Sequence, residues 1–317
     1  MNYKERIYEA WQFTQNNKKM ILWYGLLPSF ITTVFGICYT TYQIMAFKTS
    51  PIFSTNSTSF TSQVGRTVID FLRNNFSLTG PIIITAIIVF IIYMLAPVIL
   101  ESSMIQVIAR RKNGQTVNLL EGLQFGLLRF LQLFEYSLMM RTFNILSIFG
   151  IISTIVRNFG MSAFETFLPL IITIFIVGIV LNILFTFSEY FIVIDEEGVM
   201  AGVVKSCTTV ILNLQKTMML VILMLIIGIR IVIQLILVIL IPVIGLAGFA
   251  FFATTSLPEY AIYIFGGLTF AFIIFASYLA AVVYVFATAV WTFTFLDFTA
   301  HISPTAREKG EITTVKA

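Results

Sequence analysis

Six long apolar segments dominate this 317-residue sequence and restrict the folds that it can adopt. Each is at least as long as the roughly 20 helical residues that cross a hydrocarbon core about 30 Å thick. Only 11% of the residues are charged, whereas soluble globular domains carry about a quarter. The sequence therefore predicts an all-α, polytopic integral membrane protein with six transmembrane helices at Ile21–Phe47, Pro81–Val107, Leu131–Ile155, Phe167–Val193, Met218–Phe252 and Tyr260–Phe298.

Lysine and arginine are distributed unevenly between the two sides of these spans. The N-terminus, 108–130, 194–217 and the tail after Phe298 carry 13 of them, and the opposite loops carry four. Because basic residues are retained on the cytoplasmic side during insertion, we expect a multi-pass protein of the cell membrane with both termini in the cytoplasm. The basic residues form no continuous stripe, so we expect no nucleic-acid partner.

The stretch Thr116–Met139 begins as an amphipathic helix and becomes apolar all round without a break. Apolar residues recur at spacings of three and four from Val117 to Phe130, which is the pattern of a helix lying along a membrane interface. From Leu131, Glu135 is the one charge over the next nine residues. We therefore expect one helix that lies on the membrane surface and then enters the lipid.

The same unit recurs in the chain. Residues 8–24 align without a gap with 120–136, and 204–220 fits the same frame by pattern. One small-residue position is then shared by Ala10, Gly122 and Ser206. The sequence predicts a single membrane domain of three tandem two-span repeats, 1–112, 113–197 and 198–317. The alternative is that interface helices leading into lipid share such a pattern without being repeats.

Each predicted repeat returns to the cytoplasmic side with a carboxylate near the end of its second span, at Glu101, Glu189 and Asp297. Asp297 follows Glu101 by 196 residues, the same offset that relates the first and third interface helices. Repeats with two spans each share one orientation in the membrane. We therefore expect a pseudo-threefold axis along the membrane normal, with these acidic groups arranged around it.

Polar and charged side chains within the spans are the candidate binding residues, because such groups are costly in lipid. An arginine at mid-span costs about 2.5–3.5 kcal/mol on insertion scales, so Arg230 should face protein and find a partner. The candidates would line a polar interior that exchanges ion-pair partners or binds a charged headgroup. A simpler interpretation is that the acidic ones reach water, or pair with Arg129 and Arg141, and fix helix depth. The full set is Glu101, Glu135, Arg141, Glu189, Arg230, Gln234 and Asp297.

The sequence shows no pattern of a catalytic, cofactor or metal site. It has no Walker lysine loop, no Rossmann glycine fingerprint, no H-E-x-x-H and no G-x-S-x-G with a plausible histidine and acid. Two cysteines, Cys38 and Cys207, and one histidine, His301, make neither a disulfide framework nor a metal-ligand set. We therefore expect a protein that is not an enzyme and has no cofactor.

Two blocks of the sequence carry a family resemblance: GQTVNLLEGLQFGLLRFLQLF and FSEYFIVIDEEGVMAGVVKSCTTVILNLQK. They resemble the membrane domain that precedes the catalytic barrel in some bacterial glycerophosphodiester phosphodiesterases, and related six-span membrane proteins. The resemblance implies a six-helix integral protein with interface helices, and it implies no functional residues. These 317 residues contain no catalytic barrel, so phosphodiesterase activity is not expected of them.

The leading functional hypothesis is a non-enzymatic membrane protein that binds or moves a lipid-like or amphiphilic molecule, with membrane lipids as partners. One alternative is a structural or assembly module that docks a cytosolic protein on its interface helices. Another is an ion-coupled small-molecule transporter, in which Glu101 or Glu189 takes up and releases protons. The low basic content of the interface helices favours a bracing role for them over a phosphoinositide-binding one.

Overall fold

The computed structural model describes residues 3–48, 60–141, 143, 145–229, 232, 236 and 260–300. These residues form helices joined by short turns, with no strand among them, which confirms the predicted all-α class. The labelled elements are α1 (Tyr3–Asn16), α2 (Lys18–Met20), the π-helical turn η1 (Ile21–Gly25), α3 (Leu26–Lys48), α4 (Phe60–Asn74), α5 (Phe76–Lys112), α6 (Leu119–Arg141), α7 (Ile145–Leu184), α8 (Ser188–Val193), α9 (Val199–Leu212) and α11 (Tyr260–Ala300).

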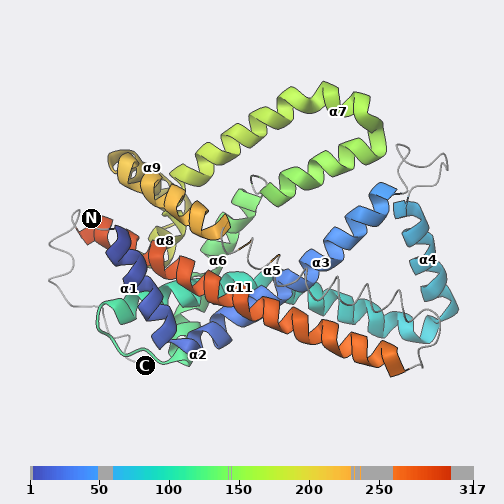
Figure 1. Ribbon diagram of the computed structural model, residues 1–317, viewed down its shortest axis with the longest axis horizontal. Helices are drawn as coiled ribbons and strands as arrows, with labels where there is room; N and C mark the ends of the chain where they lie inside the picture. The colour runs from blue at the N-terminus through green and yellow to red at the C-terminus, as the bar shows by residue number, and fades with distance from the viewer. Residues whose placement is uncertain are drawn as a thin grey trace.

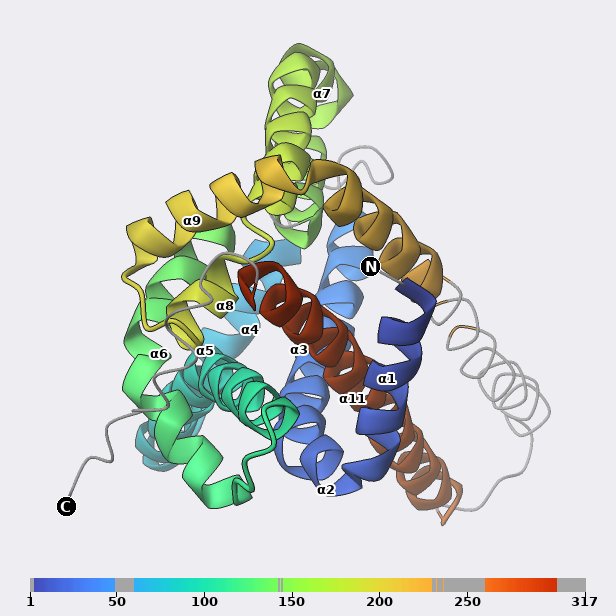
Figure 2. The same cartoon turned by 90° about the vertical axis from the view of Figure 1, so that its left-hand side faces the viewer.

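The long helices extend from a crowded end, which carries α1, α6, α8 and α9, toward an end that carries α4 (Figure 1). We call these the α1 end and the α4 end. The start of α1 and the last turn of α11 both lie at the α1 end (Figure 1). Seen from that end, α1, α6 and α9 lie on three sides of α5, α8 and α11 (Figure 2).

Four helices in the described part of the chain are long and apolar enough to cross a membrane: Lys18–Thr40, Phe76–Lys112, Ser147–Leu184 and Gly266–Thr299. The number rises to five if Val199–Leu212 and Leu214–Ile229, which meet at 97°, form one broken span. The described residues therefore contain four or five candidate membrane spans, and the number six stays a prediction. Much of the fifth predicted span, Met218–Phe252, lies outside the described residues.

The third and fourth predicted spans meet in α7, which is broken at Gly160. This glycine has φ 83° and ψ −179°, a conformation that residues with a Cβ adopt only at a high cost. The first arm of α7 runs toward the α4 end, and after the bend the second arm returns toward the α1 end (Figure 1). Because α6 ends at Arg141, the predicted third span, Leu131–Ile155, is divided between α6 and the first arm of α7.

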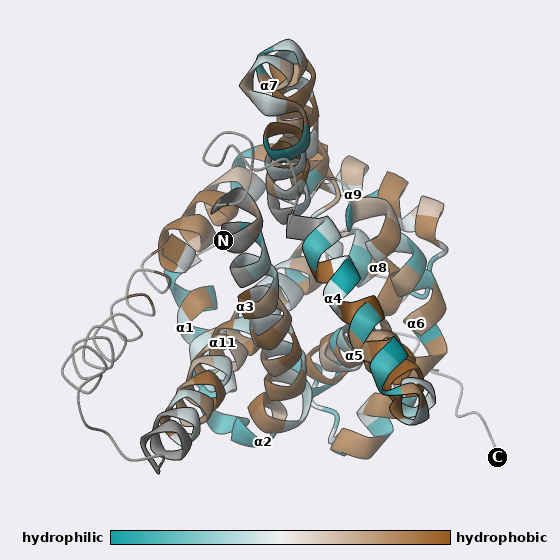
Figure 3. Ribbon diagram, turned by 90° about the vertical axis from the view of Figure 1, so that its right-hand side faces the viewer, coloured by the Kyte–Doolittle hydropathy of each residue, from teal (hydrophilic) through white to brown (hydrophobic). Residues whose placement is uncertain are grey.

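Buried residues concentrate near the α1 end. In α5, most residues from Val98 to Ala109 are buried, whereas large apolar side chains from Ile82 to Ile92 are 38–60% exposed. The long helices are predominantly hydrophobic on their outer surfaces, and α4 has both hydrophilic and hydrophobic turns (Figure 3). So large a continuous apolar surface is unfavourable in water and suits contact with lipid.

The interface helices share structural features at the positions that the sequence aligns. The small residues Ala10, Gly122 and Ser206 are all buried. α1 and α9 are each followed by an asparagine, and each asparagine amide donates to the carbonyl four residues earlier. These hydrogen bonds are Asn17 to Phe13 O, 2.7 Å, and Asn213 to Thr209 O, 3.2 Å.

Two glycines allow α6 to pack closely against α5. A Cβ on Gly122 would clash with the Val107 side chain of α5, and a Cβ on Gly126 would lie 2.6 Å from the backbone nitrogen of Ser103. The second contact is to backbone, so a side-chain rotation in α5 would not relieve it. Any larger residue at Gly126 would push the two helices apart.

We predict that Gly126→Ala destabilises the protein although alanine favours helices. The substitution gains about 1 kcal/mol in helix propensity, but overpacking costs about 1–3 kcal/mol and the backbone contact places it at the upper end. Gly65→Ala in α4 is the control, because a Cβ there meets nothing within 4 Å. Thermal unfolding in detergent should give a lower midpoint for Gly126→Ala and an unchanged or higher one for Gly65→Ala. Equal midpoints would contradict the packing described above.

Candidate functional site

Two of the predicted acidic candidates lie together. Glu101 of α5 and Glu189 of α8 are close enough for their carboxylates to interact electrostatically. Tyr284 of α11 donates a hydrogen bond to Glu101, and Tyr136 and Tyr190 lie within electrostatic range of both glutamates. We call these five residues the glutamate–tyrosine cluster. Its carboxyl and phenol oxygens suit a proton or a cation better than an anion.

A cavity of about 620 Å³ borders this cluster and lies between α6, α7, α8 and α11. Two predicted candidates, Arg141 and Glu189, line it together with Asn182. The Arg141 Nη1 lies 3.2 Å from the Met94 Sδ, and no ion pair joins Arg141 to Glu189. The structure thus brings one predicted cation and one predicted anion to a shared cavity without pairing them.

Asp297 takes part in an ion-pair network of α1, α5 and α11. Its carboxylate accepts from the Arg6 Nε at 2.7 Å, and Arg6 also binds Glu9 at 2.7 Å. Lys112 of α5 pairs with the same Glu9. The network joins the first interface helix to the ends of two long helices. Asp297 therefore has an ion-pair partner that neither of the clustered glutamates has among the described residues.

The remaining candidates occupy other places. Glu135 is exposed on α6. Arg230 and Gln234 lie outside the described residues. Arg129, which the simpler interpretation paired with the acidic candidates, binds Glu196 instead.

Sequence reasoning missed a second cavity, of about 1120 Å³, at the α1 end. One wall comes from the end of α1, α2 and η1, and the other from the end of α5, the following turn and the start of α6. We call it the basic cavity. Its lining residues are Gln15, Asn16, Asn17, Lys18, Lys19, Leu22, Trp23, Tyr24, Leu100, Arg111, Val117, Asn118, Leu119, Leu120 and Leu123.

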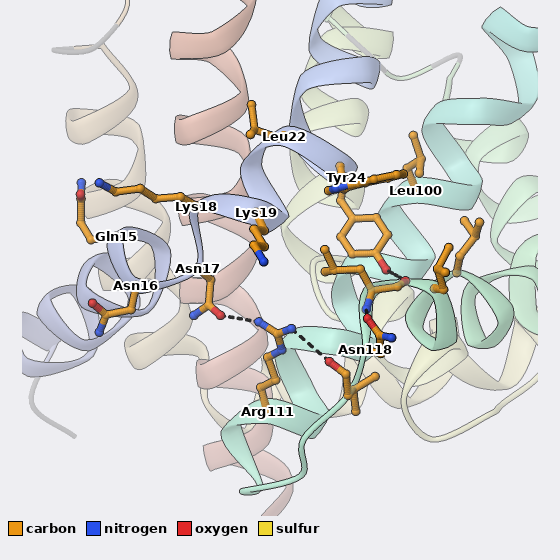
Figure 4. A pocket seen from close by; sticks show the side chains of 15 residues that line it. Gln15, Asn16, Asn17, Lys18, Lys19, Leu22, Tyr24, Leu100, Arg111 and Asn118 are labelled. Carbon is orange, nitrogen blue, oxygen red and sulfur yellow. Dashed lines mark hydrogen bonds between the residues drawn. The ribbon is translucent and has the colours of Figure 1, made fainter.

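The charged residues that line the basic cavity are all cations: Lys18, Lys19 and Arg111. The Arg111 guanidinium donates to the Asn17 Oδ1 and to the Val117 carbonyl, the latter at 3.0 Å. The Lys19 ammonium points toward this guanidinium, and Lys18 extends to the other side beside Gln15 (Figure 4). Two cations facing one space without a carboxylate between them create a positive potential there.

Local sequence chemistry shapes both walls. On the α6 side, the Asn118 Oδ1 accepts from the Leu119 N–H at 2.8 Å, and the Glu121 carboxylate accepts from the Asn118 N–H at 3.1 Å, as in a capping box. On the other side, η1 is a π-helical turn, a feature that occurs frequently at functional sites. The Tyr24 hydroxyl donates to the Leu119 carbonyl and joins the two walls.

The cavity rim is apolar and exposed. Leu22, Trp23 and Leu120 are 52%, 63% and 64% exposed, close to the two lysines. Tryptophan beside lysine is typical of the boundary between lipid and water, where an indole ring lies at headgroup level. The adjacency of Lys18 and Lys19 to Trp23 was the signal available in the sequence. Arg111, about 90 residues later, carried no sign that it joins them.

No family model, no curated protein and no solved structure matches this chain. The resemblance to the membrane domain of glycerophosphodiester phosphodiesterases therefore stays a prediction. The cavities and polar clusters of the chain itself are the features from which a function can be inferred.

We predict that Tyr24→Phe weakens the junction between η1 and α6. Tyr24 is 2% exposed, and the substitution removes the hydrogen bond that its hydroxyl donates to the Leu119 carbonyl, which should cost about 0.5–1.5 kcal/mol. Tyr8→Phe is the matched control, because Tyr8 is 62% exposed. Denaturation in mild detergent should separate the two variants, and a Tyr24→Phe protein as stable as the Tyr8→Phe protein would argue against this junction.

Proposed function

We propose that this chain is a non-enzymatic integral protein of the cell membrane that binds an anionic amphiphile in the basic cavity. Its architecture would be six spans in three tandem two-span repeats, with both termini in the cytoplasm. The shared burial of Ala10, Gly122 and Ser206 supports the repeats, as does the three-sided arrangement of α1, α6 and α9 (Figure 2). The excess of lysine and arginine in the segments at the α1 end supports the orientation.

The observation that carries the proposal is the lack of counter-ions in the basic cavity. Most other cations at the α1 end have partners: Arg6 and Lys112 bind Glu9, Arg129 binds Glu196, and Lys205 binds Glu197. Arg110 stacks on the Phe125 ring, with its Cζ 3.8 Å from the ring centre. In the described structure no carboxylate pairs with Lys18, Lys19 or Arg111. A ligand that supplies an anionic group would complete this set.

The geometry favours a phosphate-type headgroup. Arg111 is held in place by Asn17 and Val117, and the guanidinium keeps further N–H donors for a ligand. A planar guanidinium binds phosphate oxygens through two parallel hydrogen bonds, and Lys19 adds a second positive charge across the cavity (Figure 4). The Arg111 fork would hold the headgroup and Lys19 would neutralise it.

The apolar rim favours an amphiphile over a free anion. Leu22, Trp23 and Leu120 are exposed beside the cations, where an acyl chain can cover them. The volume of about 1120 Å³ exceeds the roughly 300–1,000 Å³ of typical small-ligand sites, so it can hold a headgroup and part of a chain. At the cytoplasmic face, anionic phospholipids are the abundant molecules of this chemistry.

We predict that Lys19→Gln/Arg111→Gln lowers the affinity for short-chain phosphatidylglycerol about tenfold or more, because charge-assisted hydrogen bonds are lost. Affinity for phosphatidylcholine should change little. Lys4→Gln/Lys205→Gln is the matched control, since it removes the same charge at the same end from residues that do not line the cavity. Titration calorimetry of the purified proteins measures both affinities. An equal loss in the control would show that net charge, and not the cavity, attracts the lipid.

A proton-coupled transporter is the second candidate, and the glutamate–tyrosine cluster is the observation that favours it. Glu101 and Glu189 lie together with phenol groups that can relay protons, and Glu189 lines the neighbouring cavity. Arg141 on the same cavity offers an alternative partner for a deprotonated Glu189.

For this second candidate we predict that Glu189→Gln slows proton movement in proteoliposomes. An imposed pH gradient should dissipate several-fold more slowly than with the wild type, because the amide cannot exchange a proton at this position. Glu135→Gln is the matched control, since Glu135 is exposed and outside the cluster. A luminal pH dye reports the rates. Indistinguishable rates for the wild type and both variants would exclude coupling through Glu189.

A further inference from the structure

A third cavity, of about 780 Å³, lies between α3 and the first arm of α7, and Tyr93 of α5 closes one side. Its lining runs from Thr32 to Gln43 on α3 and from Ser147 to Arg157 on α7. We call it the α3–α7 cavity. It shares no lining residue with the basic cavity, and it lies on the parts of α3 and α7 that extend toward the α4 end (Figure 1).

Arg157 is the one charged residue among those that line this cavity. Its Nη1 donates to the Tyr42 hydroxyl at 3.4 Å, and its Cζ lies 5.4 Å from the centre of the Tyr42 ring. Its Nε is buried and makes no hydrogen bond to the described part of the chain, where no carboxylate pairs with it either. A buried cationic donor without an acceptor is costly, so it marks a place where an acceptor belongs.

The rest of the cavity is preorganised. The Gln43 amide donates to the Tyr39 hydroxyl at 2.7 Å and accepts from the Ser153 hydroxyl at 2.8 Å, which fixes α3 against α7. The Phe35 and Tyr93 rings lie 4.2 Å apart and form an aromatic wall. A few fixed polar groups beside an aromatic surface are the usual composition of a small-ligand site.

We propose that the α3–α7 cavity is a second binding site, which takes an anionic phosphate or carboxylate group with Arg157 as its charged anchor. The Arg157 guanidinium, which lines the cavity, would donate to oxygens of the anion. Tyr42 holds the guanidinium from one side, and the Phe35–Tyr93 wall covers the apolar part of the ligand. The anion can come from a phospholipid headgroup or from a free phosphate ester.

The test uses the Lys19→Gln/Arg111→Gln protein as its background, so that the basic cavity does not contribute. Native mass spectrometry and calorimetry measure the binding of phosphatidylglycerol and, separately, of sn-glycerol 3-phosphate. We expect one bound phosphatidylglycerol, and adding Arg157→Gln should lower its affinity about tenfold or more. Arg73→Gln is the matched control, because Arg73 is exposed on α4 and outside the cavity.

A second variant guards against misfolding of Arg157→Gln. Gly36 lines the cavity and a Cβ there meets nothing within 4 Å, so Gly36→Phe should fold normally and obstruct binding. Loss of phosphatidylglycerol alone identifies a lipid headgroup, and loss of both probes shows that a free phosphate ester also binds. Unchanged binding of both probes by Arg157→Gln and Gly36→Phe would overturn this second site, whatever the result for the basic cavity.

Discussion

The close approach of α5 and α6 at Gly126 is the contact on which the α1 end depends. Because no Cβ separates Gly126 from the Ser103 backbone, the two helices cross at short distance and their ends are fixed relative to each other. Arg111, at the end of α5, then lies beside the start of α6 on one wall of the basic cavity. Two residues before Ser103, Glu101 lies within electrostatic range of Tyr136. The contact between Gly126 and the Ser103 backbone thus helps to position Arg111 in the basic cavity and Glu101 in the glutamate–tyrosine cluster.

The charged residues at the α1 end include two groups: one forms ion pairs within the protein, and the other lines the basic cavity. Arg6, Glu9, Lys112 and Asp297 neutralise one another and tie α1 to α5 and α11. These pairs are partly exposed, so each contributes modestly to stability, but together they fix the position of α1. The end of α1 in turn carries Asn17, which holds Arg111. The ion-pair network therefore helps to position Asn17 and Arg111. It leaves the cations that line the basic cavity without a carboxylate partner.

The sequence predicted features that depend on local pattern. The lengths of the apolar segments predicted an all-α membrane protein. The periodicity from Val117 onward predicted a helix, which the structure shows as the uninterrupted α6. The repeat register grouped Glu101, Glu189 and Asp297 around one axis, whereas the structure brings Glu101 and Glu189 together and places Asp297 in the ion-pair network with Arg6. The basic cavity could not be predicted, because Lys18 and Lys19 meet Arg111 only after two helices pack. Each predicted interface helix alone has too few basic residues to indicate an anion site, whereas α1, α2, η1, α5, α6 and the turn before α6 all contribute to one cavity.

The proposed repeats would account for the basic cavity at the first of the three predicted interface helices. The small buried positions are kept in all three interface helices, at Ala10, Gly122 and Ser206. The positions of Lys18 and Lys19 correspond to Phe130 and Leu131 in the second helix and to Leu214 and Gln215 in the third. These four residues carry no charge, so the packing frame is repeated while the cation pair belongs to the first copy alone. A packing frame that occurs three times with a cation pair that occurs once would give the α1 end one anionic-headgroup site, since two further cation pairs at the same depth would repel one another unless each were occupied.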